Sequence, residues 1–408
     1  MSDLRDAVLS RIDDEETVAL AKDLVRIPSF TTQETPCAEW LAVYLRGQGL
    51  EVTVQEIEPG RKQTIARLRG AGGGASIMLN GHIDIDPLAG GWTRDPFDPW
   101  IADGKLYGHG IYNMKAGVTA CIMAGLALKR AGAPLRGDVV IACVAAELNS
   151  GIGTLYALEH GQRADMAVVA EPYGARTILT KHTGTMDVVV HTIGRATHIS
   201  KKEQGVDAIG LMTRAIDAIN RMELTHVHDP ELPGLPRLNV GSIIGGRGRE
   251  HNLRGAYTVS DFCTAYVNVR FNASQTGETV LADIRRVLDG LAAADPRFQY
   301  EIEFPPLPAR GLGRLAKAAV DVPKTEPIVQ MVRRNLRHMT GAEPEHFGVR
   351  LPQSYAGNDT THLWAAGIPC CLYGPGGGYT DYHDVHVELA DLQLCTRVLA
   401  LTALEAAL

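Results

Sequence analysis

The chain has 408 residues, 45% hydrophobic and 21% charged, which is typical of a globular protein with two domains. Its formal net charge of -7 argues against nucleic acid as the main partner, and no run of roughly 18 apolar residues indicates a membrane span. The polar, acidic N-terminal stretch is unlike a secretory signal, and the seven cysteines lack metal-type CxxC spacing, so we expect reduced, buried thiols in a cytoplasmic protein.

Strands and helices are predicted to alternate along the first 180 residues. Residues 38–48 have apolar side chains at helical spacing, and Gly49 is a helix stop. Residues 114–132 place their apolar side chains on one face of a second helix. Compact apolar runs predict buried strands at 75–84, 137–147 and 164–172. This order predicts an α/β fold, a mostly parallel sheet with helices on both sides.

From about residue 181 the pattern changes. The predicted elements there are strands at 185–194, 264–271 and 298–304 and helices at 205–222 and 278–293. Such an order indicates a smaller α+β domain with an antiparallel sheet, inserted into the larger one. The chain then returns with a helix, a strand and a last helix. We therefore predict a larger domain formed by residues 1–180 and 304–408, and an inserted domain formed by residues 181–303.

Four polar side chains fall at the carboxyl ends of predicted strands, where ligands bind in parallel sheets. They are His82, Asp84, Glu147 and Glu171. His82 and Asp84 are two residues apart, so on a strand they would face the same side. The aspartate could then orient the imidazole while the histidine binds a metal ion. Taken alone, a His-x-Asp pair is more often an ordinary polar strand end.

The order of the motifs along the chain is much more specific. His82-x-Asp84 is followed by "LYGHGIYNMKAG", "AELNSG", "AEPYG", "GRATHIS" and "AGNDTTHLW", and then by a terminal cluster of histidines and aspartates. In this order, and along nearly its whole length, the chain resembles the metallohydrolases that include carboxypeptidase G, acetylornithine deacetylase, succinyl-diaminopimelate desuccinylase and the aminoacylases. The resemblance implies a zinc-binding catalytic domain and an inserted lid domain that often mediates dimerisation. It also implies two divalent ions bridged by an aspartate and a water, with a glutamate as general base.

Carried over residue by residue, the resemblance retains one part of this site. His82 matches the first metal-binding histidine of the family, and Asp84 matches the aspartate that orients it. Glu147 matches the general base, and Glu171 matches the acidic ligand that precedes a proline.

Three positions depart from the family pattern. Asn113 stands where the bridging aspartate is expected, and Leu148 where the second ion has a glutamate ligand. The last metal-binding histidine aligns best with Asp381, and a small gap would bring His383 or His386 to the same place.

These departures predict one catalytic ion. Two dications about 3.5 Å apart repel by roughly 19 kcal/mol at an effective dielectric constant of about 20. A bridging carboxylate and several anionic ligands normally offset this repulsion, but neutral Asn113 and apolar Leu148 cannot. We therefore expect one divalent transition metal per chain, either manganese or else zinc, cobalt or iron. Its candidate ligands are His82, Asn113, Glu171 and Asp381.

The retained residues predict a hydrolase that acts on a C–N bond. A divalent ion lowers the pKa of a bound water enough to supply hydroxide as the nucleophile near neutral pH. Glu147 would take the proton and later deliver it to the leaving nitrogen. His198, in "GRATHIS", matches the lid histidine that reaches the active site of the other subunit in the family, where it could stabilise developing negative charge.

Other residues are candidates for binding a small substrate that carries a carboxylate. Asn252 matches the family's asparagine that lies over the substrate. Arg270 is one of several arginines that could bind a carboxylate, although lid arginines are usually solvated or structural. Residues 373–386, which include Tyr379 and His383, are either a mobile loop that contacts substrate or a tight turn between a strand and a helix.

Three interpretations of the function remain open. The first is deamination of 5-nitroanthranilate to 5-nitrosalicylate by nucleophilic aromatic substitution, because the reduced ligand set is similar to that of 5-nitroanthranilate aminohydrolase, a relative with a single labile metal. The second is a deacylase of N-acyl amino acids or a small-peptide metallopeptidase, as in the rest of the family. The third is a non-catalytic binding protein with a decayed metal site. For an enzyme we expect a homodimer or higher homo-oligomer through the lid domain, without nucleic-acid or membrane partners.

Overall fold

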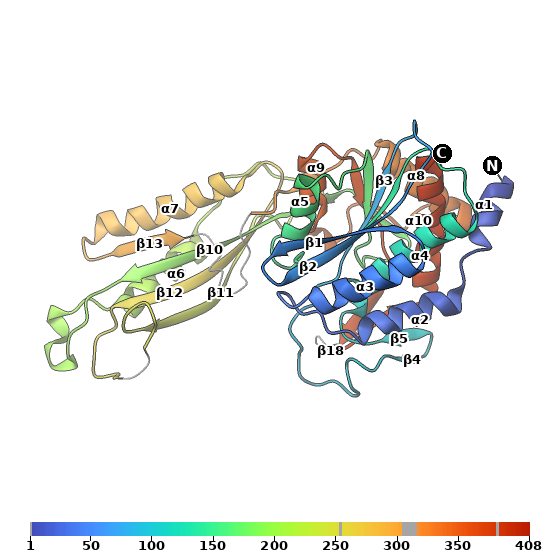
Figure 1. The fold of residues 1–408 in the computed structure, drawn as a ribbon. Coiled ribbons are helices and arrows are strands. Elements are labelled where there is room, and N and C mark those ends of the chain that lie inside the picture. The colour runs from blue at the N-terminus through green and yellow to red at the C-terminus, as the bar shows by residue number, and fades with distance from the viewer. Residues whose placement is uncertain (1, 253–254, 304–315, 381–382) are drawn as a thin grey trace. The chain divides into compact units, whose positions relative to one another are not determined.

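The computed structural model describes residues 2–408 except 253–254, 304–315 and 381–382 (Figure 1). Its contacts divide the chain into two compact units. Unit 1 comprises Met1–Lys181, Val320–Ser354 and Asn358–Leu408, and unit 2 comprises His182–Ala319 and Tyr355–Gly357. The sequence placed the return to the larger domain at residue 304, which begins a stretch outside the described residues. The contacts assign the later residues 316–319 and 355–357 to unit 2.

Unit 1 is built around an eight-stranded sheet. The strands in spatial order are β1 (Glu51–Glu58), β2 (Arg61–Leu68), β6 (Val139–Val144), β3 (Ile77–His82), β7 (Met166–Val169), β16 (Cys370–Leu372), β8 (Thr177–Leu179) and β15 (His346–Gly348). The central strands β6, β3, β7 and β16 run parallel, whereas β1 and β2 are antiparallel to their neighbours. This confirms the predicted α/β fold with a mostly parallel sheet.

Helices cover both faces of this sheet (Figure 1). On one face α4 (Ala116–Arg130) lies against β3, where Gly81 faces Val118. On the other face α5 (Ile152–Glu159) contacts the same strand, because Asn80 Nδ2 donates to Thr154 Oγ1 over 2.9 Å. The remaining helices of unit 1 are α1 (Ser2–Leu9), α2 (Asp14–Val25), α3 (Thr35–Gly47), α8 (Pro327–Thr340), α9 (Thr360–Ala365) and α10 (Leu389–Ala407).

Helix α4 is apolar on all sides because it packs between the sheet and α10. It belongs to Ile111–Arg130, the one stretch in the described part of the chain that is long and apolar enough to cross a membrane. That stretch is 89% buried within the protein, as in the core helix of a globular protein.

A second, four-stranded sheet in unit 1 corrects the prediction for residues 373–386. It consists of β17 (Gly377–Thr380), β18 (His383–Glu388), β5 (Lys105–Tyr107) and β4 (Trp100–Ala102). Residues 377–380 and 383–386 are therefore paired strands and not a loop, and His386 pairs with Tyr107 of β5, whereas residues 381–382 lie outside the described residues. The sequence feature typical of a strand was the alternation of the buried residues Val385 and Val387 with polar residues. The preceding glycines favoured a loop instead.

Unit 2 contains a four-stranded antiparallel sheet with the order β11 (Arg237–Gly246), β12 (Phe262–Phe271), β10 (Gly184–Ile193) and β13 (Gln299–Glu303). Helices α6 (Ala208–Arg221) and α7 (Gly277–Ala294) bury their apolar faces against one face of this sheet. The α+β order predicted for this part of the chain is thus present.

One close contact in unit 1 positions the end of β7. Gly117, in the first turn of α4, is fully packed against Ala170, and a Cβ atom on this glycine would lie 2.1 Å from the Ala170 carbonyl oxygen. No side chain fits there without moving backbone. The start of α4 therefore fixes the position of the residue that directly precedes Glu171.

We expect Gly117→Ala to lower the free energy of unfolding by about 1–3 kcal/mol, because the added methyl group forces α4 away from Ala170. The matched control is Gly47→Ala at the end of α3, where a Cβ atom meets nothing within 4 Å. That change should be neutral or stabilise the protein by up to about 1 kcal/mol, since alanine loses less backbone entropy. Urea unfolding measures both values, and equal effects of the two changes would contradict the prediction.

Candidate metal centre

The candidate metal centre lies at the carboxyl ends of three adjacent strands. His82 is the last residue of β3, which lies between β6 and β7 in the sheet. Glu147 follows β6 and Glu171 follows β7. Because the three strands are parallel, their carboxyl ends meet at one edge. The topology therefore brings together three side chains that are far apart in the sequence.

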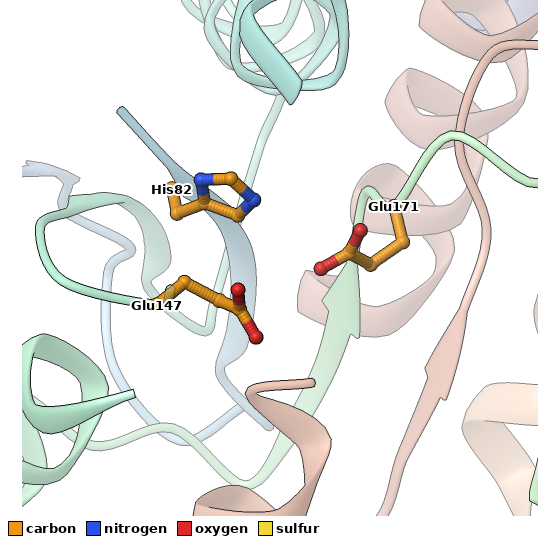
Figure 2. A group of neighbouring side chains, drawn as sticks. All are labelled: His82, Glu147 and Glu171. Carbon is orange, nitrogen blue, oxygen red and sulfur yellow. The ribbon is translucent and has the colours of Figure 1, made fainter. Parts of the chain in front are cut away.

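The three side chains converge on one point (Figure 2). One ligand atom from each of His82, Glu147 and Glu171 lies within 4.8 Å of the others, and within the described ranges no other group of three or more such side chains does so. All three residues are buried, with at most 5% of their surface exposed. A nitrogen and two carboxylate donors at this spacing fit a divalent transition-metal ion.

Both ring nitrogens of His82 face hydrogen-bond acceptors. Nδ1 lies 2.9 Å from the main-chain oxygen of Asp84 and 3.4 Å from its carboxylate, and Nε2 lies 3.1 Å from Asn113 Oδ1. Although burial disfavours the charged ring, Asp84 and then Glu147 and Glu171 raise the pKa of His82 well above its ordinary value. A metal ion at this ring would therefore compete with a proton for it.

Asp84 connects the histidine to the loop that carries Glu147. Its two carboxylate oxygens accept hydrogen bonds from the main-chain amides of Glu147 and Leu148, each at 3.0 Å. Although burial raises the pKa of Asp84, hydrogen bonds from His82 and from these two amides hold that pKa below its ordinary value. The residue predicted to orient His82 is therefore also placed to fix the position of Glu147.

Two of the three predicted departures from the family pattern, Asn113 and Leu148, lie beside this group. Asn113, in the turn before α4, presents its neutral amide oxygen to His82. Leu148 is half-buried, its main-chain amide donates to Asp84, and its hydrocarbon side chain has no ligand atom. The local donor set therefore carries less negative charge than one with carboxylates at both positions.

The described histidines and aspartates of the terminal cluster contribute no member to the group of three. Asp381 lies outside the described residues, and Tyr379 is on β17, where only its main chain is described. His383 is on β18, with its Nδ1 3.7 Å from the carboxylate of Asp384. Its ring packs against Gly91, where a Cβ atom would lie 2.8 Å from the ring.

The candidates from the inserted domain all lie in unit 2. His198 is exposed and precedes a short 3-10 helix, Ile199–Gln204, whose Ser200 amide donates to the ring over 3.2 Å. The main chain of Asn252 pairs with Arg247. Arg270 is on β12, and its Nε donates to the side chain of Asn268 over 2.9 Å. The roles of these three residues toward a substrate stay predictions.

Two polar residues near the group were not singled out from the sequence. Tyr173 follows Glu171 by two residues, and burial, followed by the charges of Glu171 and Glu147, raises the pKa of its phenol well above the ordinary value. Asn358 is 1% exposed, and its Nδ2 has no hydrogen-bond acceptor among the described residues. The available signals were the positions of Tyr173 in "AEPYG" and of Asn358 in "AGNDTTHLW".

Comparison with known proteins gives concordant matches. The model of peptidase family M20/M25/M40 matches residues 78–405. The N-formyl-4-amino-5-aminomethyl-2-methylpyrimidine deformylase of Halalkalibacterium halodurans is 26% identical, over 94% of this chain and 93% of that protein. The succinyl-diaminopimelate desuccinylase of Gluconacetobacter diazotrophicus is 27% identical, over 94% of this chain and 95% of that protein. A tripeptidase structure from Staphylococcus aureus superposes with a TM-score of 0.74 at 19% identity, over 97% of this chain and 99% of that one.

We expect the binding of one Mn²⁺ ion at pH 7 to release about one proton, because the ion needs the neutral imidazole of His82. Since the pKa of His82 is raised, the affinity should fall about tenfold for each unit of pH below that pKa. Calorimetry in buffers of different ionisation enthalpy measures the proton release. Asp84→Asn removes the charge that raises this pKa and should reduce the release. An affinity that is constant between about pH 6 and pH 8 would refute the assignment of His82.

Proposed function

The chain belongs to peptidase family M20/M25/M40, and we propose that it removes a short acyl group from the nitrogen of a small molecule that carries a carboxylate. The relatives named above are hydrolases of amide C–N bonds. The observation that carries this proposal is the convergence of His82, Glu147 and Glu171 at three parallel strand ends. The names of the deformylase and the desuccinylase support an acyl amide as the substrate class.

The chain's own residues account for the proton transfers of such a reaction. A divalent ion held by His82 and Glu171 would supply Lewis acidity and lower the pKa of water. Glu147 accepts a proton as the water oxygen bonds to the carbonyl carbon. The same carboxyl group then gives the proton to the amide nitrogen as the C–N bond breaks, so that a carboxylic acid and an amine leave. Asp84 keeps Glu147 in place through the amide of that residue.

We propose one ion per chain, with manganese, zinc, cobalt or iron as the suitable metals. The neutral amide of Asn113 and the apolar side chain of Leu148 support this number, because neither offsets the repulsion between two dications. Asp381 or one of the neighbouring histidines His383 and His386 stays a candidate for a further ligand.

Deamination of 5-nitroanthranilate gains no support from the relatives compared above. Their names describe the cleavage of formyl and succinyl amides, so the deacylase interpretation is better supported. A binding protein with a decayed site is disfavoured because Glu147 keeps a buried position beside His82 and Glu171.

We further propose that the chain acts in the cytoplasm as a homodimer or higher homo-oligomer formed through unit 2. The seven cysteines are all buried free thiols, which supports a reducing compartment. The exposed side chain of His198 supports a role toward a second subunit, as does its match to the family motif.

The proposed ion count leads to a direct expectation. Protein loaded with Mn²⁺ or Zn²⁺ and then dialysed should retain one ion per chain by elemental mass spectrometry. The double change Asn113→Asp and Leu148→Glu restores both carboxylates and should raise the count to two, since the added charges offset the repulsion between the ions. Two ions in the unchanged protein would overturn the proposal.

Turnover tests the function itself. The Mn²⁺-loaded chain should hydrolyse N-succinyl-diaminopimelate or a related N-acyl amine that carries a carboxylate, and the release of free amine measures this reaction. Glu147→Gln should lower kcat by about 10²–10⁴-fold, because the general base is lost while the proposed metal ligands remain. The matched control, Glu159→Gln at the exposed end of α5, should be fully active. Turnover of 5-nitroanthranilate and of none of the amides would instead restore the aminohydrolase interpretation.

A further inference from the structure

We propose that the hydroxyl of Tyr173 and the side-chain amide of Asn358 donate hydrogen bonds to the carbonyl oxygen of the scissile amide as negative charge develops there. The inference rests on the proposed hydrolysis of an amide at the His82 site. It assigns a chemical role to two residues that the family motifs do not single out.

An amide hydrolase needs such donors. When water adds to the carbonyl carbon, the carbonyl π electrons move onto the oxygen, and a donor held in place for that charge typically contributes a factor of about 10²–10³ to kcat. Because Asn113 is neutral and Leu148 is apolar, neither provides an anionic ligand that could hold a second cation near this oxygen. Uncharged donors from the protein would then supply the stabilisation.

Tyr173 lies on a rigid turn that begins at Glu171. Its main-chain amide donates to the Glu171 carbonyl over 2.8 Å, and the guanidinium of Arg350 donates to the main-chain oxygen of Tyr173 and to Thr177 Oγ1. The side chain lies near the carboxylates of Glu171 and Glu147 and is only partly buried. A phenol is therefore held in the charged surroundings of the proposed reaction centre.

Asn358 has a buried donor that faces the same place. Its Oδ1 accepts hydrogen bonds from the amide and the hydroxyl of Thr360, at 3.0 and 2.7 Å. These bonds fix the orientation of the side-chain amide, so that Nδ2 points away from Thr360, and the side chain faces Tyr173. Nδ2 faces the phenol oxygen of Tyr173 but makes no hydrogen bond of good geometry among the described residues, which is costly for a group that is 1% exposed. A substrate oxygen would satisfy it.

The segment that carries Asn358 adjoins the loop that carries Glu147. His362, in the helix after Asn358, lies with Nε2 2.7 Å from the Ser150 carbonyl oxygen. Gly151 fits closely against Asp359, where a Cβ atom would lie 2.4 Å from the carboxylate. The general base, the two donors and the metal-binding side chains thus belong to connected segments of unit 1.

The test compares Tyr173→Phe and Asn358→Asp in the Mn²⁺-loaded chain, with the N-acyl amine that the unchanged protein hydrolyses best. Tyr173→Phe keeps the ring and removes one donor, and Asn358→Asp keeps the acceptor for Thr360. We expect each change to lower kcat by about 10²-fold or more with KM changed less than about threefold. Tyr44→Phe on α3, where the ring stacks on Trp40, is the matched control and should be fully active.

A second readout separates a role in the transition state from a structural role. A phosphonamidate analogue, in which tetrahedral phosphorus replaces the carbonyl carbon, should bind Tyr173→Phe about 10²-fold more weakly, while the amine product should bind equally well. The ion content and the urea midpoint should stay unchanged.

The outcomes distinguish the two proposals. An unchanged protein that hydrolyses no N-acyl amine would overturn the proposed function, and this inference with it. Turnover by the unchanged protein together with full kcat in both variants would overturn the inference alone. A kcat that falls only together with the ion content or the urea midpoint would also overturn it, since Tyr173 and Asn358 would then be structural.

Discussion

The hydrogen bonds of the Asp84 carboxylate are the constraint on which the rest of the site depends. One side chain at the end of β3 holds the loop after β6 through two main-chain amides and lies against the ring of His82. A buried carboxylate costs free energy unless it is fully hydrogen-bonded, and here its partners are the groups that need a fixed position. The candidate metal ligand His82 and the candidate base Glu147 are therefore positioned by the same anion.

The chemistry proposed for the site follows from the small number of carboxylates in the group. Glu147 and Glu171 supply the buried carboxylates of the group, whereas Asn113 and Leu148 are uncharged. If the site holds one cation, as we propose, more of the stabilisation of the substrate would fall to hydrogen-bond donors. Tyr173 and Asn358 are suited to that work because neither adds a charge that would alter the affinity for the ion.

The fold was largely predictable, and so was the part of the site at the strand ends. Apolar runs that end in polar residues located β3, β6 and β7, and parallel topology brings such ends together. The hairpin of β17 and β18 was not predicted, because its glycines resemble a loop and its pairing with β5 is distant in sequence. Tyr173 and Asn358 were also missed, because only tertiary contacts show that one lies near two carboxylates and that the other has an unused donor.

The tight contact between Gly117 and Ala170 has a mechanical consequence. Asn113 lies in the turn that leads into α4, and Glu171 comes directly after Ala170. The contact therefore holds together two segments that supply candidate ligands. Because neither backbone segment can shift alone without a clash, we expect a displacement of α4 to carry Asn113 and Glu171 together and to preserve the spacing of their oxygen atoms.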